Sequence, residues 1–239
     1  MASTVQVRLD PELWFFVAVS HRVGQFELRH DGTATLGHLA ESLGVPLTEV
    51  GGFRVDGVAA AASHQPRPGA AIDIAPVARP QPLPSRFVLD VHLGKLARRL
   101  RLLGVDTAYR NDADDDELIA QAERERRVLL TQDRGILRRR ALWAGAYVRG
   151  ADPAEQLVDV VSRFAPPLAP WTRCTACNGT LVPMSKQDVL DEIEAGTRRH
   201  YEEYARCASC ARVYWRGAHA RRIDRIIQAA RRAHPGISR

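Results

Sequence analysis

The chain has 239 residues, 45% of them hydrophobic and 26% charged, with a net charge of +6. This composition is ordinary for a soluble globular protein of one large or two to three small domains, and the positive charge favours a polyanionic partner. No apolar stretch approaches the roughly 18 residues of a membrane span. Asp10 and Glu12 precede the apolar run 13–17, which is not the order of a signal peptide. We therefore expect a cytoplasmic protein without a membrane partner.

Residues 1–77 predict a ubiquitin-like β-grasp domain. Its strand-like segments are 5–9, 24–28, 53–57 and 71–77. Between the second and third of these, residues 35–44 carry leucines at helical spacing, and Gly44 provides a plausible stop. The last strand is similar to that of ubiquitin-like sulfur carriers, which need a free Gly-Gly terminus. Because this chain continues, we expect a recognition or packing role instead.

Residues 78–86 are rich in proline and lack periodicity, which predicts a stiff linker. Residues 87–166 then alternate strand-like and helical segments, which predicts an α/β domain with a parallel sheet. The expected strands are 87–90, 105–109, 128–131 and 144–148, and the expected helices are 93–103, a helix ending near 126, 134–140 and 153–164. Residues 167–239 form a third part that ends in a basic helix.

Three aspartates recur in the α/β pattern. Asp90 follows the first strand, Asp133 follows the third, and Asp115 lies in the acidic stretch 112–117 between them. The carboxyl ends of the strands form the ligand-binding edge of such a sheet, and nearby carboxylates repel one another unless a cation is shared. The pattern therefore suggests Mg²⁺ or Mn²⁺. Capping of the following helices is the alternative for Asp90 and for the acidic stretch.

Carboxylate-held metals in a basic protein indicate phosphodiester chemistry, in which two metal ions activate water and stabilise the leaving oxygen. Thr131, two residues before Asp133, is placed to orient a carboxylate or a metal-bound water. The chain contains no Gly-x-Ser-x-Gly, no Walker phosphate loop and no Gly-x-Gly-x-x-Gly. Their absence argues against serine hydrolases and against nucleotide-triphosphate and dinucleotide enzymes.

Four cysteines form two pairs with the spacing of a four-thiolate zinc site, Cys174 with Cys177 and Cys207 with Cys210. In a reducing compartment such pairs indicate metal rather than disulfides, with a redox pair or free thiols as the alternatives. Four thiolates leave no open coordination position, so this zinc would hold the fold of a zinc ribbon. Between the pairs, residues 187–195 and 197–205 can form an inserted helical arm.

At these residues the chain resembles a known family. The run 87–107 is similar to the start of the PIN-like RNase domain called the Mut-7 C-terminal domain, and 111–118 and 129–134 resemble its next two motifs. The cysteine pairs, the dipeptide at 185–186 and the run 207–219 are similar to its zinc-ribbon tail. The resemblance covers roughly residues 86–220, and bacterial members often carry an N-terminal ubiquitin-like domain.

The resemblance implies an α/β PIN-like parallel-sheet domain, preceded by the β-grasp domain and followed by the zinc ribbon. It implies a Mg²⁺- or Mn²⁺-dependent ribonuclease whose metal-binding acids are Asp90, Asp115 and Asp133, with Asp112, Asp114 or Asp116 as helpers. Structured RNA such as tRNA is a candidate substrate. The residues expected to contact RNA are Lys95, Arg98, Arg99, Arg101, Lys186, Arg212, Arg216, His219, Arg221, Arg222 and Arg225. The alternative is a non-catalytic RNA- or ribosome-binding protein with structural zinc.

Overall fold

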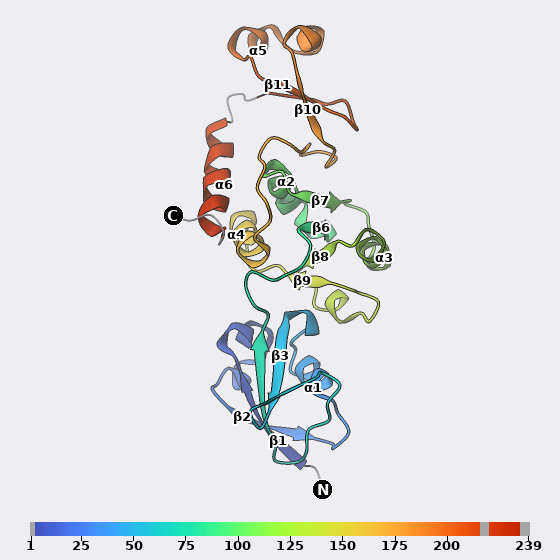
Figure 1. Ribbon diagram of the computed structural model, residues 1–239, viewed down its shortest axis with the longest axis vertical. Coiled ribbons are helices and arrows are strands. Elements are labelled where there is room, and N and C mark those ends of the chain that lie inside the picture. The colour runs from blue at the N-terminus through green and yellow to red at the C-terminus, as the bar shows by residue number, and fades with distance from the viewer. Residues whose placement is uncertain (1–2, 216–219, 235–239) are drawn as a thin grey trace. The chain divides into compact units, whose positions relative to one another are not determined.

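The computed structural model of the chain describes residues 3–215 and 220–234, and of residues 220–222 only that they are helical (Figure 1). Contacts divide the chain into two compact units. The first unit contains residues 1–79 and 133–147, and the second contains residues 80–132 and 148–239. Part of the expected α/β domain, the segment 133–147, therefore groups with the N-terminal residues.

The first unit contains a five-stranded sheet of order β2-β1-β5-β3-β4. Its strands are β1 (Ser3–Leu9), β2 (Phe26–His30), β3 (Val50–Val55), β4 (Val58–Ala60) and β5 (Ala71–Pro76). β1 pairs in parallel with β5 and antiparallel with β2. The helix α1 (Leu36–Ser42) comes between β2 and β3 in the chain. This order confirms the expected β-grasp fold.

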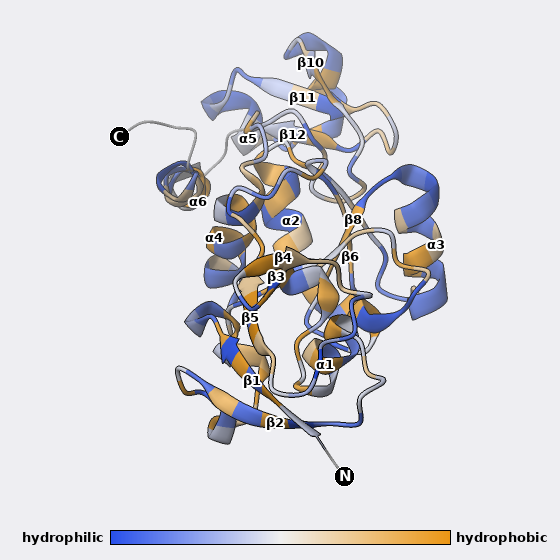
Figure 2. Cartoon of the chain, turned by 60° about the horizontal axis from the view of Figure 1, so that its bottom comes forward, coloured by the Kyte–Doolittle hydropathy of each residue, from blue (hydrophilic) through white to orange (hydrophobic). Residues whose placement is uncertain are grey.

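Alternation along β1 builds the core of this unit. Val5, Val7 and Leu9 are buried while Arg8 is exposed, because successive side chains of a strand point to opposite faces. Hydrophobic residues also run along β3 and β5 in Figure 2. Gly44 lies just after α1 with a φ of 103°, a left-handed conformation that favours glycine, so the expected helix stop is confirmed.

Several short elements of the first unit were not expected from the sequence. They are the 3₁₀ helices η1 (Pro11–Phe16), η2 (Val19–His21), η3 (Leu47–Glu49) and η5 (Ile136–Arg138). The helix expected at 134–140 is thus reduced to η5, followed by the short strand β9 (Gly145–Tyr147). Only Ile136 and Leu137 are buried in that stretch, whereas residues 138–140 are exposed arginines. One turn of buried side chains does not support a longer helix.

The second unit is built on parallel strands. Its strands are β6 (Arg86–Leu89), β7 (Asp106–Tyr109) and β8 (Val128–Thr131), and its larger helices are α2 (Gly94–Leu102), α3 (Asp115–Glu125) and α4 (Pro153–Phe164). β6 lies between β7 and β8 and pairs in parallel with both. Every residue of β8 is buried, as expected for a strand covered on two faces. Figure 1 shows α4 and α3 on opposite sides of these strands.

The cysteine-rich part of this unit forms a small antiparallel sheet of order β10-β11-β12. The strands of this sheet are β10 (Leu181–Met184), β11 (Tyr204–Cys207) and β12 (Val213–Trp215). Between β10 and β11 the chain forms η6 (Gln187–Glu192) and α5 (Ala195–His200), and the terminal helix α6 (Ala220–Ala233) follows β12 in the chain. The inserted arm packs on the sheet through Val189 and Ile193, which form a buried cluster with Tyr204 of β11. Within 3–215 and 220–234, no helix is both long and apolar enough to cross a membrane.

Candidate active site and metal centre

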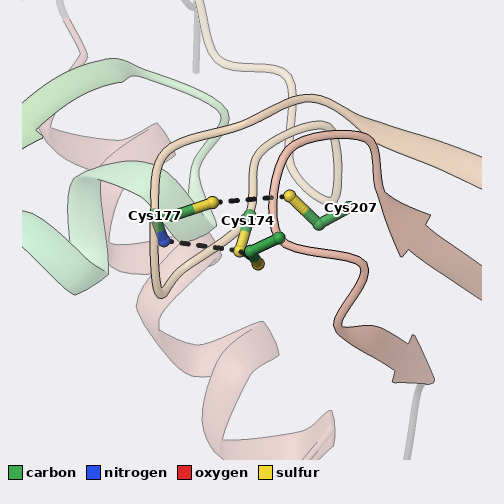
Figure 3. A group of neighbouring side chains, drawn as sticks. Cys174, Cys177 and Cys207 are labelled. Atoms are coloured by element: carbon green, nitrogen blue, oxygen red, sulfur yellow. Dashed lines mark hydrogen bonds between the residues drawn. The ribbon is translucent and has the colours of Figure 1, made fainter.

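The four cysteines meet in one cluster, with their sulfur atoms within 4.8 Å of one another. The Sγ atoms of Cys174 and Cys210 lie 3.7 Å apart, and those of Cys177 and Cys207 lie 3.4 Å apart. Thiolates arranged as a tetrahedron at about 2.3 Å from zinc lie roughly 3.8 Å from one another. In Figure 3 the labelled cysteines point toward a common centre. The cluster therefore fits a structural zinc ion.

The pKa values of these thiols differ because their local surroundings differ. Burial opposes ionisation of Cys174, but hydrogen bonds from the Tyr214 hydroxyl and the backbone N–H of Cys177 outweigh it and lower the pKa of Cys174 to about 6. Burial and the neighbouring thiols raise the pKa of Cys177 to about 12. Zinc must displace the remaining protons, so metal binding weakens as the pH falls.

The first cysteine loop is fastened to the edge strand β7. Arg101 is only 3% exposed, and its Nε donates to the Thr107 carbonyl at 2.8 Å while its Nη1 donates to the Ala176 carbonyl at 2.8 Å. Asn178 accepts a hydrogen bond from the Thr107 N–H at 2.9 Å and donates to Asp106 at 2.8 Å. The backbone groups of Thr107, at the outer edge of the parallel sheet, are thus bonded by Arg101 and by Asn178 of the first cysteine loop.

These contacts correct the expectation that Arg101 binds RNA. Its guanidinium is buried and already bonded to backbone carbonyls, so it has no surface to offer a phosphate. Burial lowers the pKa of Arg101, an effect that the nearby Cys177 and Cys174 sulfurs oppose. Arg101 therefore links helix α2 to strand β7 and to the first cysteine loop.

A second arginine was missed by sequence reasoning. Arg127 is buried at the start of β8, pairs with Asp106 at 2.7 Å, and donates to the Phe87 carbonyl at 3.2 Å. Burial of Asp106 favours its neutral form, but hydrogen bonds from Arg127 and Asn178 outweigh this and lower the pKa of Asp106. Spacing along the chain gave no signal for this pair.

Asp90 lies at the carboxyl end of β6. Its N–H donates to the Leu130 carbonyl at 3.0 Å, and its Oδ2 accepts a hydrogen bond of 2.6 Å from Thr131 Oγ1. Thr131 is fully buried and Asp90 is 8% exposed. Asp90 precedes the 3₁₀ helix η4 (Val91–Leu93), but its side chain makes no capping hydrogen bond there. The alternative of a capping role is therefore not supported for Asp90.

The turn after Asp90 is held by Tyr109 at the end of β7. The Tyr109 hydroxyl donates to the Val91 carbonyl at 2.9 Å. A Cβ atom at Gly94 would lie 2.5 Å from that hydroxyl oxygen, so only glycine leaves room for it. Sequence reasoning did not identify Tyr109 or Gly94, which fix the backbone that carries Asp90.

In the acidic stretch the structure assigns the capping role to Asp114. Asp114 Oδ1 accepts from the Glu117 N–H at 2.8 Å, and Glu117 Oε2 accepts from the Asp114 N–H at 3.3 Å, which completes a capping box. Asp115 is the first residue of α3 and is exposed, as are Asp112 and Asp116. The cap and the candidate ligand are thus different residues.

Asp133 is exposed and lies two residues beyond β8 in the chain, within the first unit. Its Oδ1 accepts a hydrogen bond of 2.6 Å from the Gly135 N–H, which closes a tight turn. Across 3–215 and 220–234, the four cysteines are the one group of three or more possible ligands that could hold a metal by themselves. An ion at the aspartates would need oxygen ligands from water or substrate, which Mg²⁺ commonly keeps.

The other expected RNA-contacting residues differ in their surroundings. Lys95, Arg98, Arg212 and Arg225 are exposed. Lys186 pairs with Glu202 at 2.5 Å. The expected contacts that lie outside the described residues are Arg216 and His219, and the side chains of Arg221 and Arg222.

A groove of about 790 Å³ brings three arginines together, Arg99, Arg149 and Arg225. Its two acids bond to backbone: Asp159 Oδ2 accepts from the Arg149 N–H and Glu155 Oε2 from the Ala151 N–H. Arg149 was not identified from the sequence, because it lies in a loop without helical periodicity.

An α/β unit with an acid at its carboxyl edge and a four-thiolate ribbon, in a chain with a β-grasp domain, defines the class of this protein. The chain matches the family described as Mut7-C RNAse domain over residues 85–227 and the one described as Mut7-C ubiquitin over residues 2–82. It belongs to the Mut7-C RNase domain family, and this membership implies a ribonuclease that acts on RNA. No curated protein and no solved structure matches the chain.

We predict that replacing Cys177 with Ser, or stripping zinc with a chelator, releases the cysteine loop from β7. The amide of Thr107, which is bonded to Asn178, should then exchange with solvent much faster, while the amides of β1 keep their protection. Hydrogen exchange resolved by residue, with zinc content measured beside it, tests this. Unchanged protection at Thr107 in the zinc-free protein would contradict the coupling.

We further predict that Arg101→Gln destabilises the second unit by about 3 kcal/mol, because buried carbonyls lose their donor. The matched variant is Arg98→Gln on the exposed side of α2, which should cost less than about 0.5 kcal/mol. Denaturant unfolding of the zinc-loaded proteins compares the two. Equal stability of the two variants would contradict the structural role of Arg101.

Proposed function

We propose that this protein is a Mg²⁺- or Mn²⁺-dependent ribonuclease that hydrolyses phosphodiester bonds of RNA, with Asp90, Asp115 and Asp133 as metal-binding acids. The observation that carries the proposal is the Asp90–Thr131 hydrogen bond of 2.6 Å. It places a carboxylate that caps no helix at the carboxyl edge of a parallel sheet, where α/β proteins bind ligands. Family membership supports the same reaction.

The residues around Asp90 have different roles in the proposed reaction. Thr131 donates to Asp90 Oδ2 and fixes the rotation of the carboxylate, and Tyr109 holds the turn that follows it. Asp115, at the first position of α3, offers a carboxylate near a helix N-terminus. Bound divalent metal would activate water and stabilise the leaving oxygen. Asp112, Asp114 and Asp116 remain possible helpers through the negative field that they add.

The four cysteines serve a different purpose. We assign them a structural zinc ion, since a closed four-thiolate site has no position for substrate. Reduced thiolates fit a reducing compartment, so we propose the cytoplasm as the location.

The rival function is RNA binding without cleavage. The observation in its favour is that the aspartates, within the described residues, form no group that could hold a metal without other ligands. In that case Asp90 and Thr131 would be a structural pair. Both functions predict structural zinc, so only the dependence of turnover on Mg²⁺ or Mn²⁺ separates them.

We predict that purified, zinc-loaded protein cleaves labelled tRNA or unstructured RNA when Mn²⁺ or Mg²⁺ is supplied and does not cleave it when both ions are left out. Asp90→Asn and Asp133→Asn should each lower kcat by at least about 100-fold, because a neutral amide is a poor metal ligand. Thr131→Val should lower it by about tenfold, since Asp90 loses its donor, while Thr131→Ser retains the hydroxyl and the activity.

The matched control is Asp191→Asn, which removes an exposed carboxylate from the inserted arm. RNA that is bound but stays whole with every metal, by wild type and variants alike, would favour the binding protein. Cleavage that survives both Asp90→Asn and Asp133→Asn would indicate contamination or a different site.

We also predict that Arg99 and Arg225 contact phosphates from their shared groove. Replacing both with Gln should flatten the dependence of log Kd on log salt concentration, by about 0.7 to 0.9 per lost contact. Arg124→Gln removes one positive charge from α3, outside the groove, and should leave the slope unaltered. Filter binding across a salt series measures it, and equal slopes for all proteins would remove the groove from the RNA interface.

A further inference from the structure

The segment 133–147 is held in place by residues of the β-grasp domain. Its own regular structure is limited to η5 and β9, which together involve six residues. So short a stretch cannot fix its conformation through internal hydrogen bonds. Within the first unit the segment contacts Phe15, Phe16, Glu41 and Glu49.

Arg134 contributes two of these hydrogen bonds. Its Nη1 donates to the Phe16 carbonyl at 2.8 Å and its Nη2 to the Phe15 carbonyl at 3.2 Å. These carbonyls lie at the C-terminal end of η1, where helix carbonyls lack partners within the helix. The guanidinium carbon also lies 5.4 Å from the Phe15 ring centre and 5.2 Å from that of Phe16, within the range of cation–π attraction.

Two further contacts hold the rest of the segment. Arg138 donates to the Glu41 carbonyl at 2.9 Å. The Tyr147 N–H donates to Glu49 Oε1 at 2.8 Å, and Glu49 is only 1% exposed. The Tyr147 ring packs against Phe15 and Phe16 at 5.2 and 5.4 Å between centres. Both ends of the segment are therefore fastened to the same domain.

Gly44 makes room for this arrangement. A Cβ atom at this position would lie 2.5 Å from the Phe16 carbonyl oxygen and 3.8 Å from Arg134 Nη1. The φ of 103° at Gly44 also disfavours other residues. The turn after α1 thus leaves the Phe16 carbonyl accessible to the guanidinium.

We infer that the β-grasp domain is a built-in positioning element for the nuclease, and that it acts through Arg134 on the neighbouring Asp133. This inference rests on the proposed function, in which Asp133 binds the catalytic metal. Arg134 is the residue next to Asp133, and the turn closed by the Asp133–Gly135 hydrogen bond joins directly to it. Holding Arg134 therefore restricts the backbone of the turn that carries Asp133, and with it the position of the Asp133 carboxylate.

The geometry of the contact makes arginine specific. A planar guanidinium can donate to two adjacent carbonyls while it lies within cation–π range of both rings, and a lysine ammonium cannot reproduce that arrangement. Arg134 is a positioning residue, since it acts on the reaction through Asp133. Misplacement of a reacting group by about 1 Å can cost on the order of 100-fold in rate.

The test measures kcat, KM for RNA and the Mn²⁺ concentration for half-maximal activity in full-length variants. Arg134→Gln should raise the Mn²⁺ requirement and lower kcat, each by about tenfold, with KM changed less than about twofold. Arg134→Lys should not restore either value. Arg140→Gln, an exposed arginine of the same segment, is the control of equal charge and should behave as wild type.

A double-mutant cycle assigns the effect to the β-grasp domain. Phe15 is 45% exposed, so Phe15→Leu should leave the domain folded while it removes the ring beside Arg134. We expect Phe15→Leu to raise the Mn²⁺ requirement about threefold and to add nothing to Arg134→Gln. Additive effects, or an Arg134→Gln protein indistinguishable from Arg140→Gln, would overturn the inference.

Hydrogen exchange separates this inference from the proposed function. Absence of cleavage by the wild type with any metal is the failure of the proposed function. Independently, Arg134→Gln and Phe15→Leu should each speed amide exchange in residues 136–147 while β1 stays protected. Unchanged exchange in that segment would overturn the positioning role whether or not the wild type cleaves RNA.

Discussion

The pairing of β6 with two parallel neighbours is the constraint on which the second unit depends. Both faces of β6 and β8 are covered, so their side chains must be apolar until the strands end, and polar chemistry is confined to the carboxyl edge. Asp90 is the first residue after β6, and Thr131 is the last residue of β8. The parallel register of the two strands brings these polar side chains into hydrogen-bonding contact. The candidate active site is thus a consequence of strand pairing.

The zinc ribbon extends this sheet. Its first cysteine loop bonds to the outer strand β7 through Arg101 and Asn178, which satisfy the N–H and C=O of Thr107 as a further strand would. An edge strand left with unpaired backbone groups would be open to association with other chains. A structural zinc ion that fixes the loop would protect this edge of the sheet, and would thereby support the strands that hold Asp90.

The sequence was sufficient wherever function depends on local spacing. The cysteine pairs, the β-grasp order and the position of Asp90 after a strand follow from periodicity and from residue type. The roles of Arg101, Arg127 and Arg134 do not, because each contacts residues remote in the chain, up to 119 positions away. An arginine on an expected helix face or loop looks the same whether it meets solvent, phosphate or a distant carbonyl.

These three arginines also change how the net charge should be understood. Each uses its guanidinium to join backbone carbonyls to another part of its unit: Arg101 at the zinc loop, Arg127 at β6, and Arg134 at η1. Arginine suits this task because its donors are fixed in a plane and its charge is weakly hydrated. Part of the positive excess is therefore committed to structure. Affinity for RNA must then come from a smaller set of exposed residues such as Arg98 and Arg225, and it will be weaker than the net charge alone suggests.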